Sequence, residues 1–128
     1  MKQNPVGWFE IYVSDMPRAR AFYEAVLGVE LSPLEAPSES GMMVEMWSFP
    51  MGENLPGAAG ALARMDGVSP GGGGTLVYFS CDDCAVEAGR VAGAGGRVER
   101  EKMSIGPYGF IALAHDTEGN LFGLHSQA

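Results

Sequence analysis

The chain has 128 residues, 46% of them apolar, and its 16 acidic against 8 basic side chains give a net charge of −8. This length and composition are typical of one globular domain, and the acidic balance argues against nucleic acid or a membrane surface as a partner. The sequence has no run of about 18 apolar residues, so no membrane span is predicted, and no secretory signal is seen before Pro5. Two cysteines are too few for a disulfide framework. We therefore expect a cytoplasmic protein.

The first predicted strand covers residues 6–15, because apolar and polar side chains alternate there. The face expected to lie on a core carries Phe9, Ile11 and Val13. The opposite face carries Trp8, Glu10 and Tyr12. A helix is predicted over residues 16–27, since Asp15 can cap its start and Gly28 can end it. Its expected buried stripe consists of Ala19, Phe22, Tyr23 and Val26.

Further strands and a second helix are expected along the rest of the chain. Two or three strands should follow, from the segments 29–36, 41–49 and 58–65. Residues 66–74, with four consecutive glycines, are predicted to be a linker. After the linker the order restarts, with a strand over residues 76–81, a helix over 84–94, and strands over 97–103, 110–115 and 121–125.

The two halves of the chain repeat one pattern. Asp15 lies 13 residues before Gly28, and Asp83, which can cap the second helix, lies 13 residues before Gly96. The sequence therefore predicts an α+β fold in a single domain over residues 1–128. Its parts are half-module 6–65, linker 66–74 and half-module 75–127, and each half-module is a βαβββ unit.

Three stretches carry a more specific pattern. They are residues 8–28, which include Ala21-Phe22-Tyr23, residues 74–79, and residues 116–125, which include Gly119-Asn120. They resemble the vicinal oxygen chelate superfamily of glyoxalase I, bleomycin-resistance proteins and ring-cleaving dioxygenases, and most of all its branch "predicted enzyme related to lactoylglutathione lyase". The resemblance implies a cup-shaped mixed sheet made by two βαβββ modules, with helices outside, a small-molecule ligand and a homodimer.

Metal-dependent members of this superfamily hold a metal with His, Gln or Glu side chains from four strands. Carried over residue by residue, the resemblance places these ligand positions at Trp8, Ala61, Leu76 and Gly123. None of them supplies the imidazole, carboxylate or thiolate that a divalent metal needs. We therefore expect neither a metal nor another cofactor.

Glu10 and His125 are the candidate catalytic residues. Strand alternation places Glu10 on the face of Trp8, and His125 on the face of Gly123. In an apolar cup a Glu and a His can act as general base and general acid, and Tyr78 can donate a hydrogen bond. The alternative is structural: a backbone group or a tyrosine hydroxyl satisfies Glu10, and His125 only ends a strand.

Aromatic side chains are the candidate substrate-binding residues. They are Trp8, Tyr12, Trp47 and Tyr78. Their flat faces suit a planar or aromatic ligand, whereas ordinary packing is the alternative for each of them. Cys81 and Cys84 form a C-x-x-C pair, but the strand pattern turns Cys81 toward the core, which favours packing over redox or zinc chemistry.

Three functions stay open on these residues. The first is a metal-independent protein that binds or transforms a small molecule. The second is a glyoxalase-type lyase or isomerase that holds its metal through non-standard residues such as Glu10 and His125. The third is a non-catalytic protein that sequesters a small molecule. Whether the protein is an enzyme is not decided by the sequence.

Overall fold

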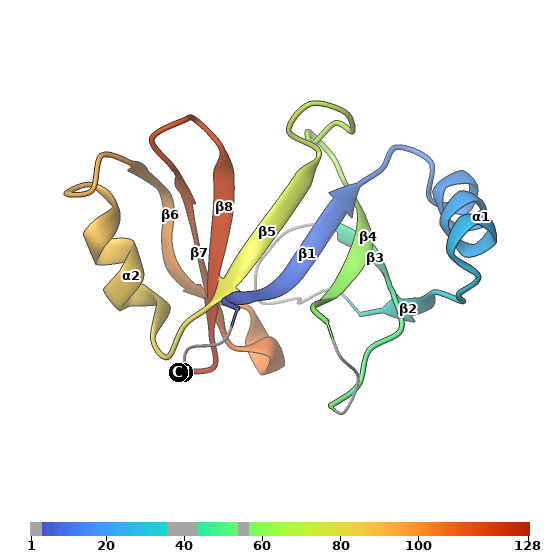
Figure 1. Cartoon of the computed structure of the whole chain (residues 1–128), viewed down its shortest axis with the longest axis horizontal. Coiled ribbons are helices and arrows are strands. Elements are labelled where there is room, and N and C mark those ends of the chain that lie inside the picture. The colour runs from blue at the N-terminus through green and yellow to red at the C-terminus, as the bar shows by residue number, and fades with distance from the viewer. Residues whose placement is uncertain (1–3, 36–43, 54–56) are drawn as a thin grey trace. The chain divides into compact units, whose positions relative to one another are not determined.

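A computed structural model describes residues 4–35, 44–53 and 57–128 and divides the chain into two compact units. The N-terminal unit contains the described residues from 9 to 75, and the C-terminal unit contains residues 4–8 and 76–128. Each unit consists of strands and one helix (Figure 1). In the described part of the chain, no helix is long and apolar enough to cross a membrane.

The N-terminal unit has its strands in the order β2-β3-β4-β1. Its elements are β1 (Val6–Tyr12), α1 (Met16–Leu27), β2 (Ser32–Leu34), β3 (Val44–Ser48) and β4 (Ala59–Met65). Of β1, residues 9–12 belong to this unit and residues 6–8 to the C-terminal unit. The pairs β2–β3 and β3–β4 are antiparallel. Helix α1 begins where Asp15 accepts a hydrogen bond from the Arg18 N–H and ends where Gly28 turns to a φ of 67°, as the sequence predicts.

The buried face of α1 differs from the predicted one. Met16 is 2% exposed, and Ala19 and Tyr23 pack with it against the core of this unit. Phe22 and Val26, by contrast, are 58% and 62% exposed, so their prediction as core residues was wrong. The physical reason is that the guanidinium of Arg20 lies over the ring of Trp47 and covers sheet surface that an apolar side chain was expected to cover.

The C-terminal unit has its strands in the order β5-β8-β7-β6. Its elements are β5 (Thr75–Ser80), α2 (Cys84–Val91), β6 (Arg97–Ser104), the 3-10 turn η2 (Gly106–Tyr108), β7 (Phe110–His115) and β8 (Leu121–Ser126). The β5–β8 pair is parallel and the β6–β7 and β7–β8 pairs are antiparallel, so the sheet is mixed. Helix α2 contacts β6, β7 and β8.

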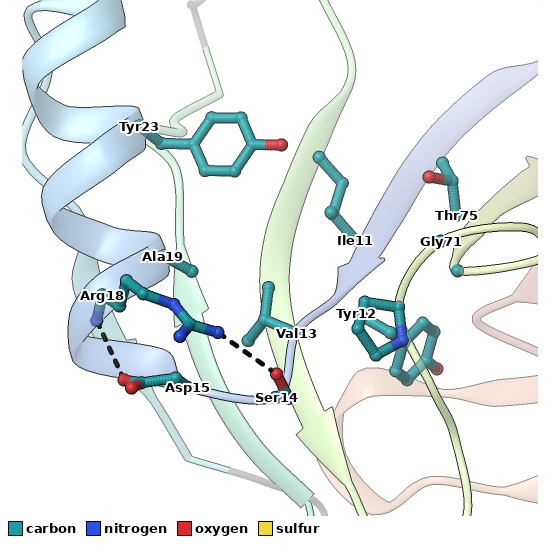
Figure 2. Close-up of a pocket in the computed structure, with 12 residues that line it drawn as sticks. Ile11, Tyr12, Val13, Ser14, Asp15, Arg18, Ala19, Tyr23, Gly71 and Thr75 are labelled. Atoms are coloured by element: carbon teal, nitrogen blue, oxygen red, sulfur yellow. Dashed lines mark hydrogen bonds between the residues drawn. The ribbon is translucent and has the colours of Figure 1, made fainter.

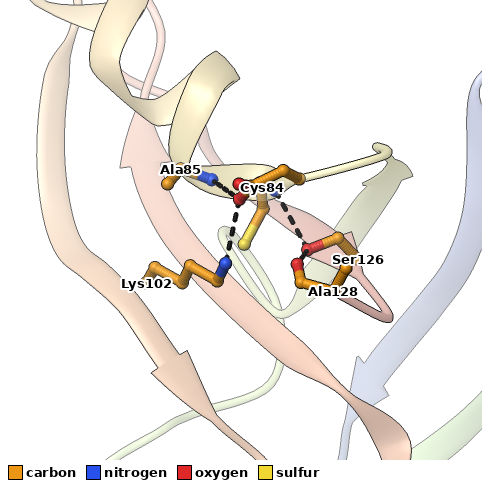
Figure 3. A network of polar contacts seen from close by, with 6 residues as sticks. Cys84, Ala85, Lys102, Ser126 and Ala128 are labelled. Carbon is orange, nitrogen blue, oxygen red and sulfur yellow. Dashed lines mark hydrogen bonds and ion pairs between the residues drawn. The ribbon is translucent and has the colours of Figure 1, made fainter.

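A short polar network fixes the start of α2 (Figure 3). Asp83 caps the helix by accepting from the Ala85 N–H at 3.0 Å, and Lys102 of β6 donates to the same oxygen at 2.9 Å. The Cys84 N–H donates to the hydroxyl of Ser126, which is 1% exposed and donates in turn to the carbonyl of Ala128. These contacts join the helix start to β6 and to the end of β8.

The α+β class with two βαβββ units and a mixed sheet is confirmed, and several element ends differ from the prediction. The strand expected over residues 29–36 is only Ser32–Leu34, with residue 36 outside the described residues. The strand expected over 41–49 is Val44–Ser48, and residues 41–43 lie outside the described residues. The second helix ends at Val91 instead of residue 94, because the Gly96 N–H turns back to donate to the Val91 carbonyl.

Candidate functional site

Glu10 and Tyr12 form a direct pair on β1. They are two residues apart, so they point to the same face of the strand, and the Tyr12 hydroxyl donates to Oε1 of Glu10 at 2.6 Å. Both residues are half-buried. A hydrogen bond to a carboxylate at this distance is strong and orients the acceptor. The sequence predicted both residues on one face, and the structure brings them together.

Trp47 lies on the other face of the N-terminal unit. It packs against the core that α1 covers, with the Arg20 guanidinium 3.4 Å from its ring centroid. Ile11 also packs on this core, and strand alternation turns Glu10 and Tyr12 away from Ile11. The structure therefore does not bring Trp47 together with Glu10 and Tyr12, and its placement favours packing over ligand contact.

Tyr78 covers the backbone of Gly123 in the C-terminal unit. The two residues are register partners in the parallel β5–β8 pair, and Tyr78 is 7% exposed. A Cβ atom built on Gly123 would overlap Cδ1 of the Tyr78 ring. The tyrosine ring thus fills the space that any side chain at position 123 would take.

His125 is held by a backbone carbonyl. Its Nε2 lies 2.6 Å from the carbonyl oxygen of Tyr108. Because a carbonyl only accepts, Nε2 carries the proton of this bond, and Nδ1 is the acceptor nitrogen of the neutral ring. Tyr108, whose carbonyl is presented by η2, is not among the predicted site residues. The turn sequence Gly106-Pro107-Tyr108-Gly109 is the sequence signal for this contact.

The candidate residues divide between the two units. Glu10, Tyr12 and Trp47 belong to the N-terminal unit, and Trp8, Tyr78 and His125 belong to the C-terminal unit. Trp8 is half-buried on β1.

The four positions at which the resemblance expects metal ligands do not fit a metal. Ala61 and Leu76 are 0% and 5% exposed and carry aliphatic side chains. Trp8 offers no ligand atom, and Gly123 lies under the Tyr78 ring. Among the described residues, no three His, Cys, Asp or Glu side chains form a group that could hold a metal ion. The side chains at these four positions therefore cannot bind the metal that the superfamily's metal-dependent members use, and no metal-dependent reaction step is inferred for this chain.

The C-x-x-C pair is packed into the core of the C-terminal unit. Cys84 is 0% exposed at the start of α2, and Cys81 packs against the same cluster. Burial, reinforced by the Glu87 carboxylate, raises the pKa of the Cys81 thiol to about 11. A thiol with this pKa is protonated at neutral pH, whereas a redox cysteine needs a stabilised thiolate. Cys81 is half-buried and packs against the core cluster, which agrees with the expected packing role.

A cavity of about 300 Å³ lies within the N-terminal unit (Figure 2). It is bounded by the end of β1, the first turns of α1 and residues 70–75. Tyr12 is the candidate residue that lines it. The sequence does not predict this cavity, because residues 11–23 and 70–75 are distant in sequence and only the fold brings them to one place.

Comparison with protein families gives one match over nearly the whole chain. The model of the Glyoxalase/Bleomycin resistance protein/Dioxygenase superfamily matches residues 6–124. Proteins of Mycobacterium bovis and Mycobacterium tuberculosis, both with the name "Putative glyoxylase CFP32", are 30% identical over 118 residues. The match covers 91% of this chain and 42% of theirs, so the chain spans about two fifths of the length of these relatives.

Solved structures share the fold. A Streptomyces coelicolor methylmalonyl-CoA epimerase variant in complex with 2-nitronate-propionyl-CoA is 20% identical, with a TM-score of 0.65 over 96% of this chain and 94% of that one. A hypothetical protein from Bacillus halodurans is 17% identical, with a TM-score of 0.71 over 99% and 96%. At these identities the likeness shows the fold alone.

Proposed function

The chain belongs to the Glyoxalase/Bleomycin resistance protein/Dioxygenase superfamily, and we propose that it binds or transforms a small molecule without a bound divalent metal. The observation that carries this proposal is the Tyr78 ring over Gly123. One expected ligand position has no side chain and no room for one, and the other three carry no ligand atom. Without a metal ion, hydrogen-bond donors of the protein must polarise the bound small molecule.

In this proposal Glu10 is the general base. Its carboxylate is oriented by the Tyr12 hydroxyl at 2.6 Å, and an oriented, half-buried carboxylate is suited to accept a proton from a bound molecule. His125 is the proposed acid. The Tyr108 carbonyl holds its Nε2–H, so the proton that His125 donates is the one that Nδ1 carries in the protonated ring, and the ring is neutral after the transfer.

The aromatic residues Trp8, Tyr12 and Tyr78 are proposed to contact the ligand. Flat rings favour a planar or aromatic molecule, and the phenol of Tyr78 supplies a hydrogen-bond donor. Trp47 is left out of this set because its ring is covered by Arg20. A cytoplasmic location and a homodimer stay predictions.

A ligand screen followed by matched variants tests the proposal. Thermal-shift hits from a panel of planar aromatic compounds and acyl-CoA thioesters are measured with EDTA present, for affinity and for turnover. We expect Glu10→Gln and His125→Ala to lower turnover about 100-fold or more while affinity changes little. Glu45→Gln, which removes a carboxylate from the exposed pair with Arg64, is the control and should change neither.

The remaining two functions give different results in the same experiment. Unchanged affinity in both variants, with no turnover in any of the proteins, would indicate a protein that only sequesters its ligand. Ligand binding that appears only when EDTA is replaced by a divalent metal, and that is lost in Glu10→Gln, would overturn the metal-independent proposal.

A further inference from the structure

We propose that the cavity of the N-terminal unit is a second binding site, which takes a small carboxylic acid with an aromatic or apolar body. Its volume of about 300 Å³ is at the small end of ligand sites and suits a single-ring molecule. Tyr12 is its one residue in common with the site proposed above.

The walls of the cavity are apolar on the side of the core. Ile11 and Val13 of the β1 end, and Ala19 and Tyr23 of α1, line it from two elements. Pro70 adds an apolar surface from the glycine-rich segment. Figure 2 shows the Tyr23 ring projecting from α1 with its hydroxyl toward Ile11. Side chains of this kind bind the body of an aromatic molecule by burial of apolar surface.

Five of the side chains that line the cavity carry hydrogen-bond donors: Tyr12, Ser14, Arg18, Tyr23 and Thr75. The Tyr12 hydroxyl donates to Glu10, and Ser14 Oγ accepts from Arg18, so the ligand is proposed to use the donors of Arg18, Tyr23 and Thr75. Among the described residues, Arg18 forms no ion pair with a carboxylate, and its side chain makes one hydrogen bond, to the Ser14 hydroxyl at 3.5 Å. Within the same part of the chain, the hydroxyls of Tyr23 and Thr75 make no hydrogen bond.

The charges around the cavity favour an anion as the partner of Arg18. Asp15 is the one acidic residue that lines it, and its Oδ1 accepts from the Arg18 backbone N–H at 3.1 Å. This carboxylate is engaged as the cap of α1, so its charge interacts with the helix start. The Arg18 guanidinium is positively charged, so a negatively charged ligand can pair with it. A guanidinium binds a carboxylate through two parallel hydrogen bonds.

Titration with benzoate, followed by ¹H–¹⁵N NMR, tests this site. We expect saturable shifts of the amides of Val13, Ala19 and Gly71, which line the cavity, and none at Gly89 on α2. Arg18→Gln should weaken benzoate binding about tenfold or more, as expected for loss of a charge-assisted hydrogen bond. Tyr23→Phe, which keeps the ring and removes only the hydroxyl, should weaken it a few-fold.

Two controls distinguish specific binding in this cavity from non-specific attraction between benzoate and positive charges of the protein. Arg90→Gln removes the same charge from an exposed position on α2 and should leave benzoate affinity unchanged. Benzamide has the same ring without the charge and should bind more weakly than benzoate. Equal binding of benzamide and benzoate, or an Arg18→Gln protein that folds and binds benzoate normally, would overturn the proposal.

The benzoate experiment tests the cavity separately from the function proposed above. Glu10→Gln and His125→Ala should leave the benzoate shifts at Val13 and Ala19 in place, because neither residue lines this cavity. Loss of turnover in those variants with benzoate binding retained supports both proposals. Retained turnover in Glu10→Gln, with benzoate binding lost in Arg18→Gln, overturns only the first.

Discussion

Position 123 must be glycine, because the packing of the Tyr78 ring leaves no room for a side chain there. The Tyr78 ring lies where a Cβ atom would be, so glycine at 123 and tyrosine at 78 depend on each other. The sequence alone shows that Gly123 offers no ligand atom. It does not show that a neighbouring ring takes the space, because that contact joins residues 45 positions apart.

The pair makes a prediction about stability. Gly123→Ala should lower the free energy of unfolding by about 1–3 kcal/mol, because the added methyl group must displace a buried ring. In the Tyr78→Ala background the same substitution should cost much less. Urea unfolding of the four proteins measures this coupling. Gly89→Ala, on the helix surface with open space around it, is the control and should be neutral or stabilising. Equal costs of Gly123→Ala in both backgrounds would contradict the account.

The thiol of Cys81 gives a second prediction at this scale. Burial and the nearby Glu87 raise its pKa to about 11, so little thiolate exists at pH 8. In a Cys84→Ala variant, Cys81 should react with iodoacetamide at pH 8 far more slowly than N-acetylcysteine does. The rate should rise as the pH approaches 11 and after unfolding in urea. Alkylation at the rate of the free thiol would contradict the half-buried position of Cys81 against the core cluster.

The helices show which features of an element can be predicted. The start and end of α1 follow from Asp15 and Gly28, because caps are local in sequence. The buried face of α1 does not, since Arg20 and Trp47 meet only through the tertiary fold. The same distinction applies to the site, where the Glu10–Tyr12 pair is two residues apart and predictable. The contact of His125 with the Tyr108 carbonyl uses a backbone atom and has little sequence signal.

The cap of α2 gives a prediction about pH. The hydrogen bonds that Asp83 accepts from the Lys102 ammonium and the Ala85 N–H lower its pKa in the folded protein. The stabilisation is therefore present above the unfolded-state pKa of about 3.9 and is lost as the pH falls through the lower folded-state value. Asp83→Asn, which keeps a capping oxygen, should be less stable than the natural protein at pH 6, and the difference should shrink toward pH 2.

The prediction is checked by measuring the urea midpoint of unfolding of the natural protein and the variants between pH 6 and pH 2. Asp82→Asn removes the same charge from the neighbouring exposed residue and is the control. The lowered pKa of Asp116, which accepts from Asn120, is common to all three proteins and cancels in the comparison. A difference between the natural protein and Asp83→Asn that stays constant with pH would contradict the proposed role of the Lys102 contact.

At the scale of the whole molecule, the repeat was predictable because each half carries its own strand, capped helix and glycine stop. Asp15 and Asp83 cap the two helices as the repeat predicts. The grouping of residues 4–8 with residues 76–128 was not expected from the half-module 6–65. One contact that joins these two segments is the backbone hydrogen bond from the Ser80 N–H to the Pro5 carbonyl at 2.8 Å. The domain boundaries and the cup stay predictions.

The measurement that tests the central claim most directly is the metal content of the protein. The protein is purified without chelator or affinity tag, incubated with Ni²⁺, Zn²⁺, Co²⁺ or Mn²⁺, and desalted before elemental analysis. The account predicts far less than one metal ion per chain in every case, because the four ligand positions hold tryptophan, alanine, leucine and a glycine under a tyrosine ring. One retained metal ion per chain, lost in Glu10→Gln or His125→Ala, would contradict it.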